Sequence, residues 1–154
     1  MKAVIALGSN LEEPEKNVEL AITLISDSME LLARSSFYKT KPVGGPPQPD
    51  YVNAICIVDS ILPPMELLNL LLGIEKSMGR IRTEKWGPRI IDCDLITYGD
   101  FVIESDPLTL PHPRAHERRF VLEPWYEIEP EAILPGHGRI KDILAQDQKG
   151  LEQC

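Results

Sequence analysis

Cysteine is scarce in this sequence, and long apolar segments are absent. The chain has three cysteines among 154 residues and no C-x-x-C pair. A disulfide framework is therefore not expected, and a reducing compartment is favoured. No apolar run is long enough to cross a membrane, and the run over residues 3–7 is too short for a signal peptide. We expect a cytoplasmic protein with no membrane partner.

The short motifs that mark many nucleotide and hydrolase sites are also missing. The sequence contains neither a G-x-x-x-x-G-K-[ST] loop nor a G-x-G-x-x-G turn after a strand, so a backbone cradle for phosphate is not expected. It has no G-x-S-x-G turn, and its three histidines lack the H-E-x-x-H spacing of zinc hydrolases. Any phosphate chain must then be held by side chains and metal, with arginine best suited to bidentate contact.

The chain has the length and composition of one domain. Its 154 residues are 43% hydrophobic and 26% charged, which is ordinary for a soluble protein with a full core. We therefore expect a single domain over residues 1–154.

An excess of negative charge is combined with two short basic stretches. The net charge is −8, yet residues 79–89 carry four basic side chains against the acid Glu84. Residues 112–119 carry Arg114, Arg118 and Arg119 against Glu117. This charge distribution is unfavourable for binding long nucleic acid, but it suits the binding of one small polyanion at a single site. Solvated surface charge is the plainer interpretation of either stretch alone.

Two carboxylates interrupt an apolar run at 90–96, which reads as a buried strand. Asp92 and Asp94 then project from one face, about 7 Å apart along the chain, while Cys93 points to the other face. Neighbouring carboxylates in an apolar setting are costly. A divalent cation removes this conflict, and Mg²⁺ prefers such oxygen ligands together with phosphate oxygens. A strand that ends at solvent explains the pair equally well.

Periodicity along the chain predicts an α+β fold. Apolar runs predict strands, and apolar residues at helical spacing after Pro14 and Pro64 predict helices. The order βαββαβ with C-terminal helices predicts helices on one face of a mostly antiparallel sheet. A tight hairpin is expected at 98–103. Strands are expected at 2–7, 29–38, 51–60 and 90–96, and helices at 14–25, 63–78, 117–127 and 140–145.

Two polar residues stand in unusual settings. Asn53 lies within a strand-like run, where asparagine is depleted. This indicates either a specific hydrogen-bonding role or a strand-edge contact with a loop. His112 lies between two prolines in a rigid extended segment, which would suit aiming an imidazole at a phosphate. A loop histidine without a role fits the local sequence as well.

Several motifs in order resemble those of the 6-hydroxymethyl-7,8-dihydropterin pyrophosphokinase family, which moves pyrophosphate from ATP to a pterin alcohol in folate biosynthesis. The resemblance runs from Leu7 to about Pro130 and implies a ferredoxin-like fold that works as a monomer. The motifs are Leu7-Gly8-Ser9-Asn10-Leu11, Ser36-Phe37-Tyr38-Lys39-Thr40, Pro49-Asp50-Tyr51-Val52-Asn53-Ala54, the stretch from Glu75 to Arg82, Trp86-Gly87-Pro88-Arg89, Asp92-Cys93-Asp94, and Pro111-His112-Pro113-Arg114.

Residue by residue, the resemblance implies a site with three parts. It implies two Mg²⁺ ions held by Asp92 and Asp94, with ATP as co-substrate and Asp94, Arg80 and Arg89 assisting transfer. The pterin ring would stack between Tyr51 and Phe120 and pair with Asn53, although a core role is the plainer interpretation of Phe120 alone. The remaining pterin residues would be Thr40, Pro42, Val43, Trp86 and Asp92. The ATP residues would be Glu75, Arg82, Trp86, Leu95, Thr109, His112 and Arg118.

Two positions depart from the family pattern. Pro107 stands where some members carry a phosphate-facing arginine, so that ATP contact is either missing or supplied by Arg114 or Arg119. Leu72 stands where some members have a polar residue near the base. Two other functions remain open. A pterin- or nucleotide-binding module without transfer would not need paired aspartates, and a metal-dependent phosphohydrolase would release phosphate from ATP alone.

Overall fold

An apolar strand forms the middle of the central sheet. The computed structural model describes residues 1–42, 45–79, 90–146 and 152–153. Strand β1 (Lys2–Ser9) pairs with β4 (Tyr51–Asp59) on one side and with β5 (Asp92–Tyr98) on the other. β1 and β4 are buried along most of their length, as expected of strands covered on both faces. The strand expected at 2–7 is therefore confirmed, and it lies at the centre of the sheet.

The sheet extends from this centre by antiparallel pairing. Its order is β10 (Glu152–Gln153), β3 (Tyr38–Thr40), β4, β1 and β5, and β2 (Glu30–Arg34) also pairs with β4. Strand β3 pairs with β4, and β10 pairs with β3. All pairings among the described strands are antiparallel.

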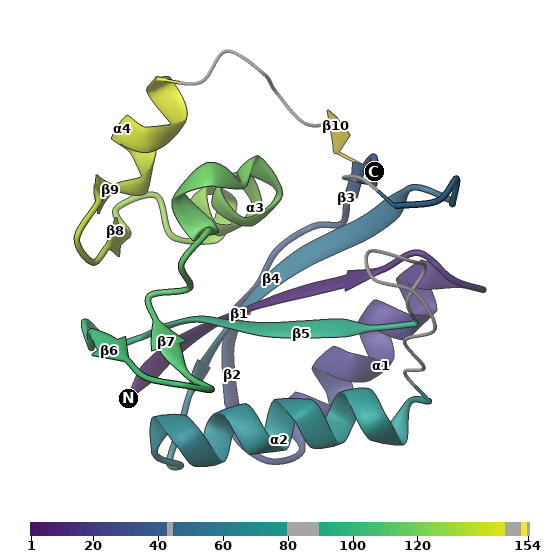
Figure 1. Cartoon of the computed structure of the whole chain (residues 1–154), viewed down its shortest axis with the longest axis horizontal. Helices are drawn as coiled ribbons and strands as arrows, with labels where there is room; N and C mark the ends of the chain where they lie inside the picture. The colour runs from purple at the N-terminus through teal and green to yellow at the C-terminus, as the bar shows by residue number, and fades with distance from the viewer. Residues whose placement is uncertain (43–44, 80–89, 147–151, 154) are drawn as a thin grey trace.

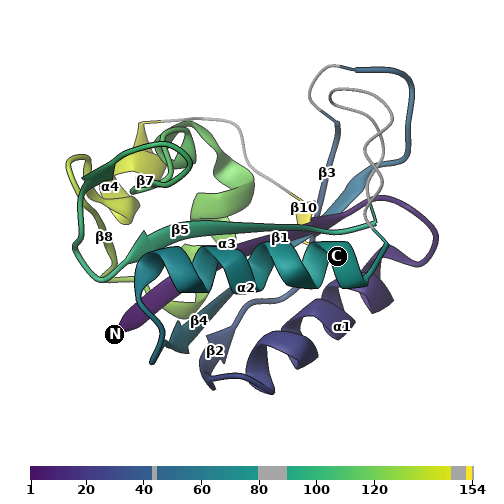
Figure 2. The same cartoon turned by 60° about the horizontal axis from the view of Figure 1, so that its bottom comes forward.

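Helices cover both faces of the sheet (Figures 1 and 2). Helices α1 (Pro14–Ser26) and α2 (Pro64–Ser77) pack on one face, and α3 (Arg119–Ile128) and α4 (Ile140–Ala145) pack on the other. Each face has its own apolar core, because alternate residues of a strand point to opposite sides. The α+β class and the helix starts at Pro14, Pro64 and Ile140 are confirmed. The prediction that the helices share one face was wrong.

Two other local predictions were wrong. The single strand expected at 29–38 is divided into β2 and β3. The hairpin expected at 98–103 does not form: β6 (Ile103–Glu104) pairs with β7 (Thr109–Leu110) instead of returning along β5. Helix α2 packs beside β5, and its Glu75 accepts the Cys93 backbone N–H. A returning strand would need this same edge.

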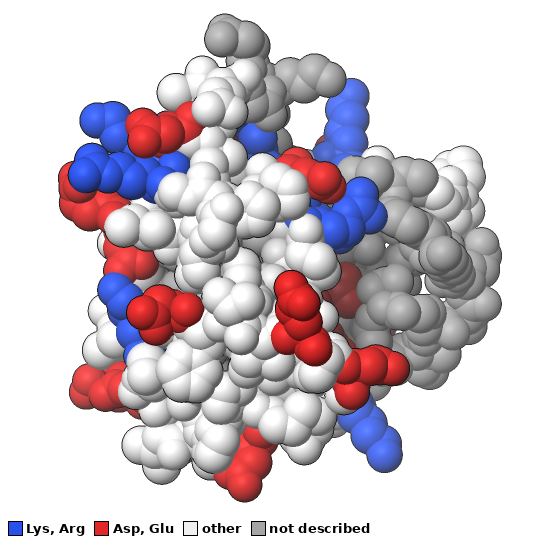
Figure 3. Space-filling view, turned by 60° about the vertical axis from the view of Figure 1, so that its left-hand side comes forward, with Lys and Arg blue, Asp and Glu red and all other residues white. Residues whose placement is uncertain are grey.

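The elements after β7 are short. A 3₁₀ turn, η1 (Ala115–Glu117), leads into α3, and a small hairpin of β8 (Ile133–Leu134) and β9 (Gly138–Arg139) leads into α4. No helix in the described part of the chain is long and apolar enough to cross a membrane. Figure 3 shows acidic and basic side chains interspersed around a broad uncharged area on one face.

A bulge in β5 decides which of its side chains reach the α3 face. Ile5 pairs with Leu95 but Val4 pairs with Thr97, so β5 carries one extra residue. Ile96 packs in the core under α3, whereas Cys93 and Leu95 pack in the core under α1 and α2. Strand alternation then puts Asp92 and Asp94 on the α3 face. Cys56 and Cys93 are buried free thiols.

Candidate active site

The antiparallel register aligns one residue from each of four strands in a row across the sheet. Tyr38 of β3 pairs with Asn53 of β4, Asn53 pairs with Gly8 of β1, and Gly8 pairs with Asp92 of β5. Neighbouring strands lie about 4.8 Å apart, so Asn53 and Asp92 are about 10 Å apart across the sheet. Residues as far apart in sequence as Gly8 and Asp92 thus share one end of the sheet, on the α3 face.

Asn53 is fixed by a side-chain hydrogen bond. It is 6% exposed, and its Nδ2 donates to Thr40 Oγ1 at 2.7 Å. Thr40 in turn pairs with Tyr51, so the three polar residues expected at the pterin pocket lie together. A buried amide needs such partners, since leaving a polar group unpaired is costly.

Gly8 leaves open the space beside Asn53. A Cβ atom added at Gly8 would lie 2.9 Å from Asn53 Oδ1 and 3.6 Å from Tyr51 Cδ1. The first distance is shorter than real contacts of a Cβ atom allow. The missing side chain therefore lets Asn53 and Tyr51 approach β1, between the expected pterin and metal residues.

The two aspartates are half-buried, and a side chain of α2 hydrogen-bonds to the backbone between them. The Cys93 backbone N–H donates to Glu75 Oε2 at 2.7 Å. Glu75 belongs to α2 and is 5% exposed. Burial, together with the charge of Glu75, raises the pKa of the Cys93 thiol well above its usual value, so Cys93 is not a nucleophile.

The donor set on β5 fits magnesium. No group of three or more His, Cys, Asp or Glu side chains within the described ranges is placed to hold a metal. Asp92 and Asp94 supply carboxylate oxygens from one face of one strand. Mg²⁺ is commonly bound by one or two carboxylates, with waters and substrate phosphates completing its octahedral shell. Two carboxylates are therefore sufficient here.

A cation at the start of α3 lies within electrostatic range of this pair. Arg118, the residue before α3, lies 5.4 Å from the centre of the Phe120 ring, within the range of a cation–π contact. Burial lowers the pKa of Arg118, while the charges of Asp94 and Asp92 act to raise it. The negative charges of both carboxylates therefore stabilise the charged form of the Arg118 guanidinium.

His112 is presented as a neutral hydrogen-bond donor. Its backbone N–H donates to Ile96 O at 2.8 Å, which joins its loop to β5. Its Nδ1 accepts the Arg114 N–H at 3.2 Å, so the neutral ring carries its proton on Nε2. Burial lowers its pKa to about 4, and the positive charges of Arg118 and Arg114 act in the same direction.

Some expected site residues are not brought to this cluster. The Leu95 side chain is 4% exposed and lies in the core under α1 and α2, so it faces away from the aspartates. Thr109 is exposed on β7, and its Oγ1 donates to Ser105 O at 3.3 Å. Pro42 is half-buried after β3. Val43, Arg80, Arg82, Trp86 and Arg89 lie outside the described residues.

Sequence reasoning assigned no role to Asn10. It is 1% exposed, and its Nδ2 donates to Gln48 Oε1 at 2.7 Å and to Pro49 O at 3.0 Å. The loop after β1 is thereby tied to the segment just before Tyr51. The available signal was the polar Gly-Ser-Asn run directly after an apolar strand, but its partner cannot be read from spacing.

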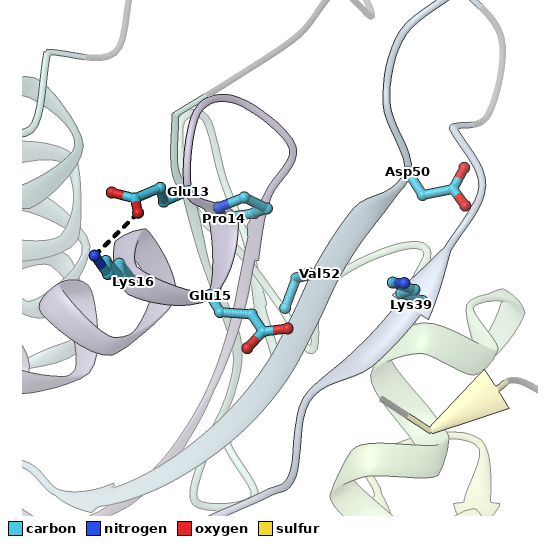
Figure 4. A pocket seen from close by; sticks show the side chains of 7 residues that line it. All are labelled: Glu13, Pro14, Glu15, Lys16, Lys39, Asp50 and Val52. Atoms are coloured by element: carbon cyan, nitrogen blue, oxygen red, sulfur yellow. Dashed lines mark ion pairs between the residues drawn. The ribbon is translucent and has the colours of Figure 1, made fainter.

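A separate pocket of about 540 Å³ opens on the other face of the sheet (Figure 4). Val52 is part of its lining and belongs to the core under α1 and α2, so this pocket is not part of the aspartate cluster. Lys16 pairs with Glu13 at 2.9 Å within its wall. The lining residues are Glu13, Pro14, Glu15, Lys16, Lys39, Asp50 and Val52.

Comparison with known families decides the family of this chain. Residues 4–130 match the family described as 7,8-dihydro-6-hydroxymethylpterin-pyrophosphokinase. The chain belongs to this family. The resemblance read from the sequence motifs is thereby confirmed, as is the expectation of a pyrophosphokinase of folate biosynthesis, a transferase that uses ATP as co-substrate.

Individual relatives of the pyrophosphokinase family agree with this assignment. The 2-amino-4-hydroxy-6-hydroxymethyldihydropteridine pyrophosphokinase of Haemophilus influenzae is 42% identical over 146 residues, covering 94% of this chain and 91% of the relative. The enzyme of the same name from Synechocystis is 45% identical over 139 residues, covering 89% of this chain and 71% of the relative.

Solved structures confirm the fold. The Plasmodium falciparum HPPK-DHPS wild type with pteroate has a TM-score of 0.74 and 14% sequence identity. The match covers 94% of this chain but 42% of that longer chain. The ferredoxin-like α+β architecture expected from the motifs is therefore that of the family.

Proposed function

We propose that this chain transfers pyrophosphate from ATP to the hydroxymethyl group of 6-hydroxymethyl-7,8-dihydropterin, releasing AMP. The observation that supports this most is the register of β4, β1 and β5. It puts Asn53 and Asp92 on either side of Gly8, about 10 Å apart. A pterin held at Asn53 and a phosphate chain held at the aspartates would then meet over β1.

The pterin half of the proposed site uses flat rings and one amide. Tyr51 and Phe120 come from opposite layers, β4 and α3, and would stack on the two faces of the ring. Asn53, fixed by Thr40, would offer its remaining polar atoms to the edge of the ring. Pro42, Val43 and Trp86 would complete this half.

The phosphate half uses carboxylates and cations. Asp92 and Asp94 would hold two Mg²⁺ ions, which neutralise charge on the phosphate oxygens and orient them. His112 would donate from Nε2 to a phosphate oxygen without adding charge, and Arg118 would add a charged donor. Glu75, Arg82, Trp86, Leu95 and Thr109 are the further ATP residues that the family resemblance implies.

The reaction needs in-line positioning more than covalent help from the protein. The hydroxymethyl oxygen would attack the β-phosphorus of ATP and lose its proton to solvent. The bond from the β-phosphorus to the oxygen shared with the α-phosphate would break, so that AMP leaves with that oxygen. Arg80 and Arg89, with Asp94, are the residues proposed to assist this transfer. We further propose that the protein acts as a cytoplasmic monomer with one domain over residues 1–154 and binds neither nucleic acid nor membranes.

The test is AMP formation from Mg-ATP, with and without 6-hydroxymethyl-7,8-dihydropterin. The chain is compared with Asp92→Asn/Asp94→Asn and with a matched control, Asp100→Asn, which changes an exposed aspartate in the turn after β5. AMP that forms only with pterin, persists in the control and is lost in the double variant supports the proposal. Pterin binding without AMP indicates a binding module, and phosphate release without pterin indicates a hydrolase.

A further inference from the structure

One carboxylate near the end of α3 accepts hydrogen bonds from polar groups of β3 and of the segment just before it. Glu127 Oε1 accepts the Ser36 N–H at 3.1 Å and the Tyr38 O–H at 2.8 Å. Glu127 Oε2 accepts the Ser36 N–H at 3.2 Å and the Ser36 hydroxyl at 2.8 Å. Both oxygens are used, and the partners lie about 90 residues away in sequence. We call this cluster of Ser36, Tyr38 and Glu127 the α3–β3 clasp.

The β3 side of the clasp leads directly to the pterin residues. Tyr38 pairs with Asn53 and Thr40 pairs with Tyr51 in the register of β3 with β4. Thr40 also accepts the hydrogen bond from Asn53. A shift of β3 would therefore move the partner of Asn53 and the neighbour of Tyr51 together.

The α3 side of the clasp leads to the other ring. Phe120 and Glu127 are seven residues apart on the same helix, so they lie on one side of it, about 10 Å apart along its axis. α3 is also joined to α4, because Arg119, which pairs with Glu123 within α3, donates to the carbonyl of Leu144. Within the described residues, the clasp joins the Glu127 side chain of α3 to β3 and to the segment just before it.

The chemistry of the clasp requires an acceptor at position 127. Tyr38 is 8% exposed. Burial and then the hydrogen bond to Glu127 raise the pKa of Tyr38 well above its usual value. The phenol therefore stays a donor, and three donor groups converge on one side chain. A carboxylate offers only acceptors, whereas an amide would turn an N–H toward a donor.

We propose that Glu127 is a positioning residue for the pterin pocket, and that the α3–β3 clasp fixes the gap between Phe120 and Tyr51. This inference rests on the proposed function, since it assumes that a pterin ring fills that gap. A ring stacked between two others needs them about 7 Å apart, and a gap wider by 0.5–1 Å loses about a quarter to a half of the dispersion energy. Small movements of α3 thus change pterin affinity.

The test measures pterin dissociation constants with a non-hydrolysable ATP analogue bound, and KM for both substrates. The variants are Glu127→Gln, Tyr38→Phe and their double variant. The matched control is Glu129→Gln, which makes the same change just after α3, where the carboxylate contacts Trp125 and Lys2 rather than β3. Thermal unfolding of each variant checks that it folds.

For Glu127→Gln we expect pterin binding about 10-fold weaker, the size of one weak charged hydrogen bond. We expect KM for ATP within about 2-fold, and a double variant no worse than about 2-fold beyond Glu127→Gln, because the two residues act through one contact. Unchanged pterin affinity would overturn the inference, as would equal losses in both substrates or in the Glu129→Gln control. A chain that binds pterin but forms no AMP would refute the proposed function while leaving the clasp testable by binding.

Discussion

Replacing Gly8 with alanine tests how tightly the two halves of the site meet. The added Cβ would lie 2.9 Å from Asn53 Oδ1, so the amide must move by a few tenths of an ångström. Asn53 is held by its 2.7 Å bond to Thr40, and losing a hydrogen bond of this kind costs about 1 kcal/mol. The backbone itself gains, because alanine replaces glycine in a strand, which is worth about 0.5–1 kcal/mol. These two effects nearly cancel in the free energy of unfolding.

Pterin affinity has no such compensation. A displaced Asn53 points its polar atoms away from the ring edge, and mismatched buried hydrogen bonds cost about 1–3 kcal/mol, or roughly 5- to 140-fold in affinity. We therefore expect Gly8→Ala to fold normally and to bind pterin at least about 5-fold more weakly. KM for ATP should change less.

The assay is pterin binding by fluorescence titration, beside urea unfolding of the same variants. Gly73→Ala is the matched control, because a Cβ added at Gly73 meets nothing within 4 Å. In the middle of α2 it should raise stability by about 1 kcal/mol, and pterin affinity should not change. If Gly8→Ala binds pterin as tightly as the wild type, Asn53 does not contact the ring edge in the way proposed.

Three further predictions concern the phosphate half. Asp94→Asn should lower kcat at least about 100-fold with pterin binding retained; a smaller loss in steady-state AMP formation would argue against a metal ligand at this position. Glu75→Leu should cost about 1–3 kcal/mol in urea unfolding because it leaves the buried Cys93 N–H unpaired, whereas Glu75→Gln keeps an acceptor and should cost less. His112 has its pKa lowered to about 4 by burial, so the unfolded chain binds more protons between about pH 4 and 6.5. Wild-type stability should therefore fall as pH is lowered through this window; a melting-temperature profile of His112→Gln with the same slope would contradict the assignment.

Local sequence signals were sufficient for most elements. Pro14 and Pro64 both occupy the first helical turn, as proline does when its missing N–H is not needed. The alternation at 92–94 correctly predicted that Cys93 lies in the core and that the aspartates lie on the other face of the strand. These features depend only on neighbouring residues, so a single sequence contains them.

The same local signals could not predict contacts between residues that are far apart in the sequence. Nothing in the spacing shows that Gly8 lies beside Asn53, or that Glu127 meets Ser36 and Tyr38. The hairpin after β5 failed because α2 packs beside that strand, and the division of 29–38 into two strands follows from their separate pairings with β4. Such outcomes depend on which elements pack together, a tertiary effect that overrides local preference. The roles of the expected site residues remain predictions.

Two separate devices support the two halves of the proposed site. On one side, Glu75 of α2 holds the strand between Asp92 and Asp94; on the other, the α3–β3 clasp holds Phe120 relative to Tyr51. The devices come from helices on opposite faces of the sheet, and they share no described contact. Sites without shared partners behave additively in free energy. Substituting Glu75 should therefore change the dissociation constants for magnesium and ATP, and substituting Glu127 should change the dissociation constant for the pterin. Gly8 lies between the two halves, so Gly8→Ala combined with either variant should depart from additivity.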